Sequence, residues 1–129
     1  MANPSNLKYT KEHEWVSIQD NIATIGITDH AQSELGEIVY VEVETVGEEV
    51  AKDEVFGTVE AVKTTSDLFM PLSGKVIEFN PELDESESDN PGAINESPYE
   101  DGWIIKVEIS NSAEIEELLS AEDYEGLIA

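Results

Sequence analysis

The sequence predicts a mainly β protein in which two small antiparallel sheets pack face to face and a helical segment follows at the C-terminus. Short apolar runs that alternate with polar residues recur along the chain, and turn-forming residues separate them. A helical periodicity appears chiefly near the end of the chain. Because 129 residues suit one domain with one core, we expect residues 1–129 to form a single unit.

The first elements are expected to be a hairpin and a short helix. Alternating residues at 15–18 and 23–27 flank the turn-forming pair 20–21, which predicts two paired strands. Asp29, with a glutamine three residues later, forms a variant of the capping box, and Gly36 is a natural stop for the helix that follows.

Further strands follow this helix. Val39, Val41 and Val43 predict the inward face of one strand. Alternation predicts additional short strand segments within 46–53, 77–79 and 103–109.

A second hairpin is expected over residues 56–76, with Lys63 at its tip. The β-branched residues before Lys63 favour a strand, and the residues at 64–67 are compatible with a turn. An apolar run then resumes at 68–70 and ends at Pro71.

Residues 81–101 are dense in acidic, serine, asparagine and proline residues, a composition that would allow a disordered linker. Ile94 and Tyr99 have the character of buried residues and favour an ordered loop instead.

Two short helices are expected at the C-terminus, over about 112–128. Asn111, followed three residues later by Glu114, is the expected cap of the first helix, and Ser120 of the second. The residues expected to face inward are Ile115, Leu118, Leu119, Tyr124, Leu127 and Ile128.

The charge of the chain excludes several classes of partner. Thirty acidic residues stand against six basic ones, all of them lysine, and the formal net charge is −24. Nucleic acids and anionic membranes require clustered Lys and Arg, so neither is expected as a partner. The charge favours solubility and steers encounters with basic patches on partner proteins.

No catalytic or metal-binding constellation is visible. His13 and His30 have no ligand-type spacing, and the chain has no cysteine, so neither a zinc site nor a disulfide is expected. No nucleophile elbow, P-loop or dinucleotide fingerprint occurs. Residues 1–10 lack the apolar core of a signal peptide, and no run approaches the length of a membrane span, so we expect a cytoplasmic protein. Since no catalytic constellation is visible, we do not expect an enzyme.

Lys63 has two interpretations. A lysine at a hairpin turn usually serves solvation. Here cations are rare, and the neighbours Val62 and Thr64 carry no charge that would pair with it, so an accessible amine suited to enzymatic modification is the alternative.

The residues around Lys63 resemble the lipoylation segment of the glycine cleavage system H protein family, in the run GTVEAVKTTSD followed by PLSGKV. The segments YTKEHEWV, GITDHAQSELGEIVYVEVETVG and SPYEDGWIIKV resemble the same family, so the similarity is nearly chain-long. Three departures are small: Ala61 replaces a frequent serine, Thr64 replaces a frequent alanine, and the stretch 81–90 is unusually acidic.

The resemblance implies a barrel-sandwich hybrid of the biotinyl/lipoyl-carrier type with short helices and a C-terminal helical extension. It also implies lipoate joined by an amide to Lys63. The implied partners are glycine decarboxylase (P protein), aminomethyltransferase (T protein), dihydrolipoamide dehydrogenase (L protein) and a lipoylating enzyme. The chain is expected to visit them as a monomer.

The resemblance to this family also suggests functions for three acidic residues. A loaded arm would carry an ammonium group, so Glu14 and Asp67 are hypothesised to hold it against the protein surface. The alternative is that they are two ordinary surface acids among thirty. Glu60 is a candidate for presenting Lys63 to the lipoylating enzyme.

Other classes of carrier protein and one function without a carrier role are alternatives to this interpretation. Lipoyl domains of 2-oxo acid dehydrogenases typically have Asp-Lys-Ala at the acceptor and lack the C-terminal extension, and biotin carriers have Met-Lys-Met. This chain has Val62-Lys63-Thr64. A lipoyl relay, or an unmodified acidic interaction protein of the same fold, is the remaining alternative.

Overall fold

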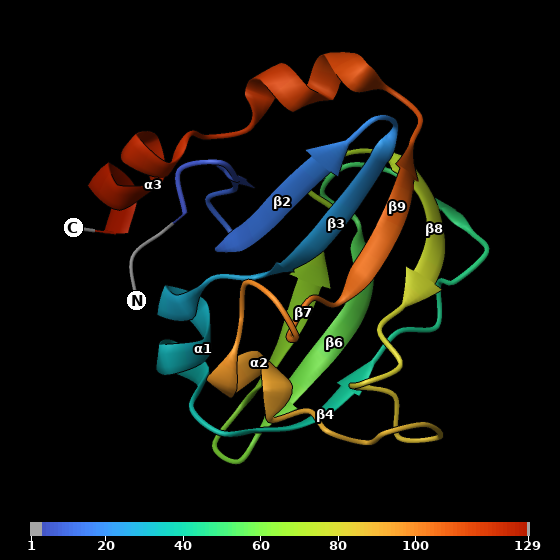
Figure 1. The fold of residues 1–129 in the computed structure, drawn as a ribbon, viewed down its shortest axis with the longest axis vertical. Helices are drawn as coiled ribbons and strands as arrows, with labels where there is room; N and C mark the ends of the chain where they lie inside the picture. The colour runs from blue at the N-terminus through green and yellow to red at the C-terminus, as the bar shows by residue number, and fades with distance from the viewer. Residues whose placement is uncertain (1–3, 129) are drawn as a thin grey trace.

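The computed structural model describes residues 4–128 and shows a mainly β fold with two antiparallel sheets (Figure 1). Within these residues the larger sheet has six strands in the order β1-β2-β3-β9-β8-β5, and the smaller has three in the order β4-β6-β7. The strands of the larger sheet are β1 (Lys8–Tyr9), β2 (Glu14–Gln19), β3 (Ile22–Ile27), β9 (Ile105–Ile109), β8 (Gly74–Phe79) and β5 (Glu49–Val50). Those of the smaller sheet are β4 (Ile38–Glu42), β6 (Val55–Ala61) and β7 (Thr65–Phe69).

Four helical segments complete the described chain: α1 (Asp29–Leu35), α2 (Ala93–Glu96), the 3₁₀ helix η1 (Ser112–Glu117) and α3 (Ala121–Ile128). We expected residues 1–129 to form a single unit; of these, residues 1–3 and 129 lie outside the described residues. The predicted two-sheet arrangement with a C-terminal helical extension is confirmed.

Apolar side chains from both sheets form the main core, because each strand turns alternate residues inward. Fully buried members are Val16, Ile25 and Val107 from the larger sheet and Val41, Val59 and Leu68 from the smaller. Since β6 and β7 both contribute to this core, the strands of the hairpin that carries Lys63 are anchored along their length.

Bulges explain two errors in the predicted alternation. The register of β4 against β6 shifts between Ile38 and Tyr40, so Ile38 and Val41 are buried while Val39 is 42% exposed. The prediction that Val39 faces inward is therefore wrong. A similar shift in β8 leaves Ile77 exposed. A bulge adds one residue to one strand, which reverses the face of the residues beside it.

The start of α1 lies one residue earlier than predicted. Thr28 is the N-cap, since its Oγ1 accepts a hydrogen bond of 3.2 Å from the amide of Ala31. Asp29 occupies the first turn and accepts a 2.8 Å bond from Nε2 of Gln32. The predicted stop at Gly36 is confirmed, because this residue has a φ of +83° that suits glycine.

The acidic stretch at 81–101 is an ordered loop, as Ile94 suggested. Ile94 is fully buried in the main core. Asn80 fastens the loop at its base, because its Nδ2 donates to the carbonyls of Asp101 at 2.9 Å and Trp103 at 2.7 Å.

The C-terminal extension differs from the expectation in three details. Its first helix is a 3₁₀ helix, and Leu119 lies beyond it, exchanging backbone hydrogen bonds of 2.7 and 2.8 Å with Tyr9. Glu114 accepts from the backbone of Ser73 at 2.7 Å instead of completing a capping box. Leu127 is 50% exposed, so its predicted inward orientation is wrong.

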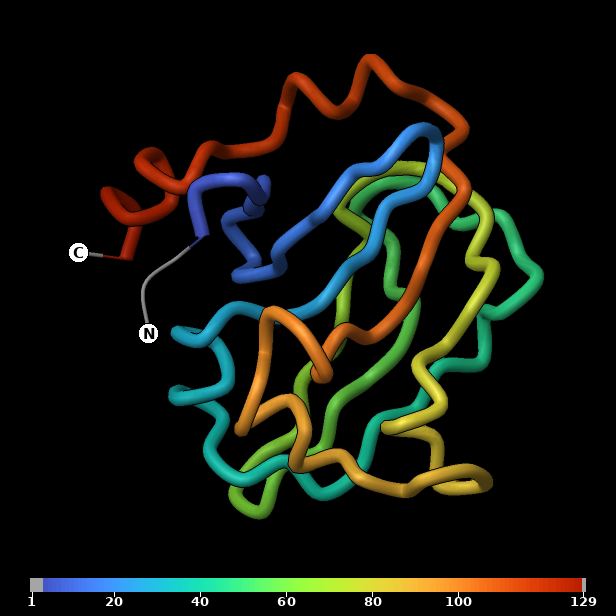
Figure 2. The backbone as a smooth tube through the Cα atoms, viewed as in Figure 1, coloured from blue at the N-terminus to red at the C-terminus, as the bar shows by residue number. Residues whose placement is uncertain are grey.

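The caps predicted for these helices are confirmed, because Asn111 accepts from the amide of Ala113 and Ser120 from that of Asp123. Figure 2 shows the C-terminal segment returning to the N-terminal strand. There a second apolar cluster forms, whose buried members are Leu7, Tyr9, Trp15, Ala121 and Tyr124.

Candidate functional site

The hairpin of β6 and β7 presents Lys63 at its tip, as predicted. The last ladder pair is Glu60 with Thr65, and the amide of Ala61 donates to the carbonyl of Thr64 at 2.7 Å. Lys63 is exposed, and its neighbour Val62 is 71% exposed. A rigid strand pair thus holds an accessible amine clear of the two sheets.

A cavity of about 150 Å³ lies between this hairpin, α1 and the residues that lead into β2. We call it the hairpin cavity. Its lining residues are Glu12, His13, Glu14, Ile27, Ala31, Glu34, Leu35, Val59, Ser66, Asp67 and Leu68. The structure therefore brings together Glu14 and Asp67, which are far apart in the sequence. Glu60 does not line this cavity and is exposed on β6.

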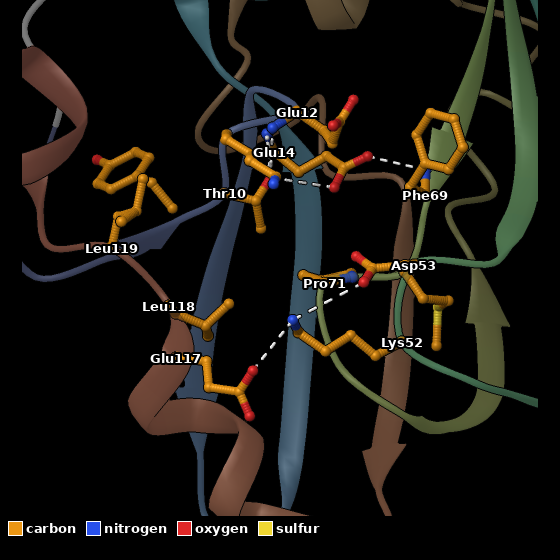
Figure 3. A pocket seen from close by; sticks show the side chains of 13 residues that line it. Thr10, Glu12, Glu14, Lys52, Asp53, Phe69, Pro71, Glu117, Leu118 and Leu119 are labelled. Atoms are coloured by element: carbon orange, nitrogen blue, oxygen red, sulfur yellow. Dashed lines mark hydrogen bonds and ion pairs between the residues drawn. The ribbon is translucent and has the colours of Figure 1, made fainter. Parts of the chain in front are cut away.

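Glu14 is a buried carboxyl group, with 2% of the residue exposed. Its Oε2 accepts a 2.8 Å hydrogen bond from the amide of Phe69, and its Oε1 accepts one of 3.2 Å from the hydroxyl of Thr10 (Figure 3). Burial raises the pKa of Glu14 to about 8, against the opposing effect of the Phe69 and Thr10 hydrogen bonds. The alternative that Glu14 is an ordinary surface acid is therefore wrong, whereas Asp67 is exposed.

A second and larger cavity, of about 230 Å³, is also lined by Glu14 (Figure 3). We call it the terminal cavity, since the C-terminal segment closes one wall. Lys52 spans it with its Nζ 3.3 Å from Glu117 and 3.9 Å from Asp53. Sequence reasoning missed this cavity because four distant segments form it: 9–14, 52–53, 69–71 and 117–119. It contains neither Asp67 nor any residue of α1.

The two histidines meet beside the hairpin cavity, which their spacing did not predict. The rings of His13 and His30 lie 4.9 Å apart between centroids. Nδ1 of His13 lies 2.8 Å from the hydroxyl of Tyr124, which lies 2.7 Å from Oγ1 of Thr28. Burial, and then the neighbouring His30, lower the pKa of His13. Among residues 4–128, no group of three or more His, Cys, Asp or Glu side chains is placed to hold a metal ion.

Comparison with known families shows to which family the chain belongs. The sequence model of the family described as "Glycine cleavage H-protein" matches residues 7–129. The chain belongs to this family. Among curated relatives, the "Glycine cleavage system H protein" of Staphylococcus epidermidis is 53% identical over 99% of this chain and 98% of that protein. The protein of the same name from Staphylococcus saprophyticus is 54% identical over the same shares.

Membership of the family is also visible in the fold. The crystal structure of a glycine cleavage system H protein from Mycobacterium marinum superposes with a TM-score of 0.85 at 37% identity. The match covers 96% of this chain and 97% of that one. The predicted barrel-sandwich fold of the lipoyl-carrier type is confirmed. No helix in the described part of the chain is long and apolar enough to cross a membrane.

Proposed function

We propose that the chain is a lipoyl carrier of the glycine cleavage system, with lipoate attached to Lys63 by an amide bond. Membership of the glycine cleavage H-protein family supports this function. The observation that carries the assignment to Lys63 is the position of an exposed lysine at the tip of a rigid hairpin, beside a cavity. We take residues 1–129 to act as one non-catalytic carrier unit.

The bound lipoyl group would supply a long flexible arm with a reducible dithiolane at its end. The chain would carry the aminomethyl group of glycine from the pyridoxal-phosphate-dependent glycine decarboxylase to the tetrahydrofolate-dependent aminomethyltransferase. Dihydrolipoamide dehydrogenase would then re-oxidise the carrier. Covalent attachment keeps the local concentration of the arm high at each partner, so a monomeric cytoplasmic carrier with reversible docking suffices.

The hairpin cavity has the chemistry that such an arm requires. Apolar side chains suited to a hydrocarbon chain line much of it, namely Ile27, Ala31, Leu35, Val59 and Leu68. Carboxyl groups suited to an ammonium group line most of the remainder, and Glu14 and Asp67 are among them. The cavity therefore fits both the stem and the charged end of a loaded arm. The terminal cavity also combines apolar and acidic side chains, but of the hairpin strands it includes only Phe69, at the end of β7 away from the tip.

Glu14 and Asp67 are the proposed contacts of the ammonium group. Because the pKa of Glu14 is about 8, this group is largely neutral near neutral pH and would release its proton when a cation binds beside it. Asp67 is exposed and would meet the cation at the cavity mouth. Together they would hold the arm inside the cavity and keep water from its labile end.

Variants of these two residues are expected to lose protection of the loaded arm. Asp67→Asn and Glu14→Gln keep the side-chain size and remove the charge, so each is expected to release ammonia about tenfold faster than wild type, the effect of losing one charge-assisted hydrogen bond. Ammonia release would be measured on fully lipoylated, loaded protein without partner enzymes. Glu108→Gln, an exposed acid on the other sheet, is the matched control. Equal release from all four proteins would exclude the contacts.

Mass spectrometry of the protein isolated from its own source tests the attachment site. We expect the mass increase of an amide-linked lipoyl group on the peptide that contains Lys63. An unmodified Lys63 in cells that contain lipoate would instead favour an acidic interaction protein. In the same measurement, an unchanged lipoylated fraction in Glu60→Ala would remove the recognition role proposed for Glu60.

A further inference from the structure

The side chain of Lys63 lies across the backbone of Gly36, at the end of α1. A methyl group built on Gly36 would lie 3.2 Å from Cε, 3.8 Å from Cδ and 3.7 Å from Nζ of Lys63. Glycine suits the φ of +83° here, and any side chain at this position would also displace the end of the lysine side chain by a few tenths of an ångström. Leu35, the preceding residue, lines the hairpin cavity. The lysine stem therefore lies against the residue that directly follows a lining residue of that cavity.

The hairpin tip is also tied to this turn through the backbone. The amide of Val62 donates a 3.0 Å hydrogen bond to the carbonyl of Glu37. This bond joins the residue before Lys63 to the residue after Gly36. The tip and the turn between α1 and β4 are thus held in one relative position, although β6 and β7 alone would leave the tip unsupported.

Asn95 holds the turn from the opposite side. Its Oδ1 accepts a 2.9 Å hydrogen bond from the amide of Ile38, and its Nδ2 donates to the carbonyl of Gly36 at 2.9 Å. Nδ2 also donates to Oε1 of Gln32 in α1 at 2.8 Å. One side chain from α2 therefore fastens both ends of the Gly36–Ile38 turn, a role that no local signal around residue 95 indicates.

We propose that Gly36 and Asn95 are positioning residues for the carrier lysine: they direct the stem of Lys63 along the edge of the hairpin cavity. This inference rests on the proposed lipoyl attachment to Lys63. If the first segment of the arm already has a fixed direction, the arm loses less conformational entropy when its end enters the cavity. A larger fraction of the molecules then holds the arm inside the cavity, where it is protected. Neither residue is expected to contact the reacting atoms.

The test compares Asn95→Ala with Asn80→Ala. Asn80 is a matched control, since its side chain also makes three hydrogen bonds, with the backbone of Asp101, Trp103 and Glu82, and none of them is to the Gly36–Ile38 turn. The lysines of the unlipoylated protein would be reductively dimethylated with ¹³C-formaldehyde and a borohydride reductant, which preserves their charge. Methyl relaxation by NMR would then report the mobility of each lysine.

We expect Lys63 in the wild type to be less mobile than Lys75, which is exposed on β8. Asn95→Ala should raise the mobility of Lys63 to that of Lys75, and Asn80→Ala should not. In the lipoylated and loaded protein, Asn95→Ala should release ammonia about threefold faster, as the protected population falls. If Asn95→Ala and Asn80→Ala gave the same mobility at Lys63, the inference would be wrong.

A second pair of variants is available if Asn95→Ala does not fold. Gly36→Ala and Gly47→Ala both place a side chain at positive φ, but a methyl group at Gly47 would meet nothing within 4 Å. Only Gly36→Ala should mobilise Lys63; equal effects would overturn the proposal. Because the NMR measurement uses the unlipoylated protein, it tests the positioning role even if mass spectrometry shows that Lys63 is not lipoylated in cells.

Discussion

Lys63→Arg is expected to abolish both lipoylation and the glycine decarboxylation that the chain supports, while the fold remains intact. A guanidinium group does not form the lipoyl amide, so no variant protein would carry an arm. Since Lys63 is exposed at a hairpin tip, the free energy of unfolding should change by no more than about 0.5 kcal/mol. Decarboxylation would be measured with glycine decarboxylase and the other partners, using ¹⁴C-labelled glycine.

Lys75→Arg is the matched control for this experiment. Lys75 is also exposed and also lies on a strand, but in β8 of the larger sheet. It should retain the wild-type rate and the wild-type lipoyl content. A Lys63→Arg protein that still supported decarboxylation above background would contradict the carrier function. Loss in both variants would show that the effect at Lys63 is not specific to the lipoyl attachment site.

Glu14 is expected to make the protein lose stability as pH rises from about 4.5 to about 8. The unfolded chain ionises this carboxyl group near 4.5, but the folded protein keeps it protonated until about 8, because the group is buried. Between these values the folded state binds more protons than the unfolded state, so rising pH favours unfolding. The pKa change corresponds to a loss of up to about 5 kcal/mol.

Glu14→Gln should remove this part of the pH dependence, because the amide retains an oxygen to accept from Phe69 and does not ionise. Urea unfolding of wild type and variant at about pH 5 and about pH 8 would measure the difference in the free energy of unfolding. Glu108→Gln, on the exposed face of β9, should keep the wild-type slope. Parallel pH profiles for wild type and Glu14→Gln would show that Glu14 ionises normally in the folded protein.

The hairpin that carries Lys63 followed from local signals. β-branched residues favour a strand before Lys63, and turn-compatible residues follow it, so the pairing partners lie close in sequence. The observed register places Glu60 opposite Thr65, so Lys63 lies at the tip as predicted, but residues 65–67, which were expected in the turn, already belong to β7. The helix stop at Gly36 was predictable for a similar reason, because positive φ is a property of one residue.

The inward side of each strand or helix, and the residue that caps each helix, were less predictable. Both depend on the elements that pack against them. Val39 continues the alternation of its strand, yet a bulge against β6 turns it outward. Thr28 and Asp29 are both competent N-caps, and the structure uses Thr28. Leu127 has the spacing of an inward residue, but α3 packs through Ala121 and Tyr124 instead.

Composition and short-range pattern in this chain were enough to predict a two-sheet β fold, an exposed lysine at a hairpin tip and an acidic surface unsuited to nucleic acids. Each of these depends on neighbours within a few residues or on the sum of charges. Three features could be known only from the tertiary structure. Glu14 is buried, Glu14 and Asp67 line the same cavity, and Asn95 is hydrogen-bonded to the Gly36 turn. Those contacts join segments more than fifty residues apart, and only the packing of the two sheets and α2 brings them within hydrogen-bonding distance or into one cavity.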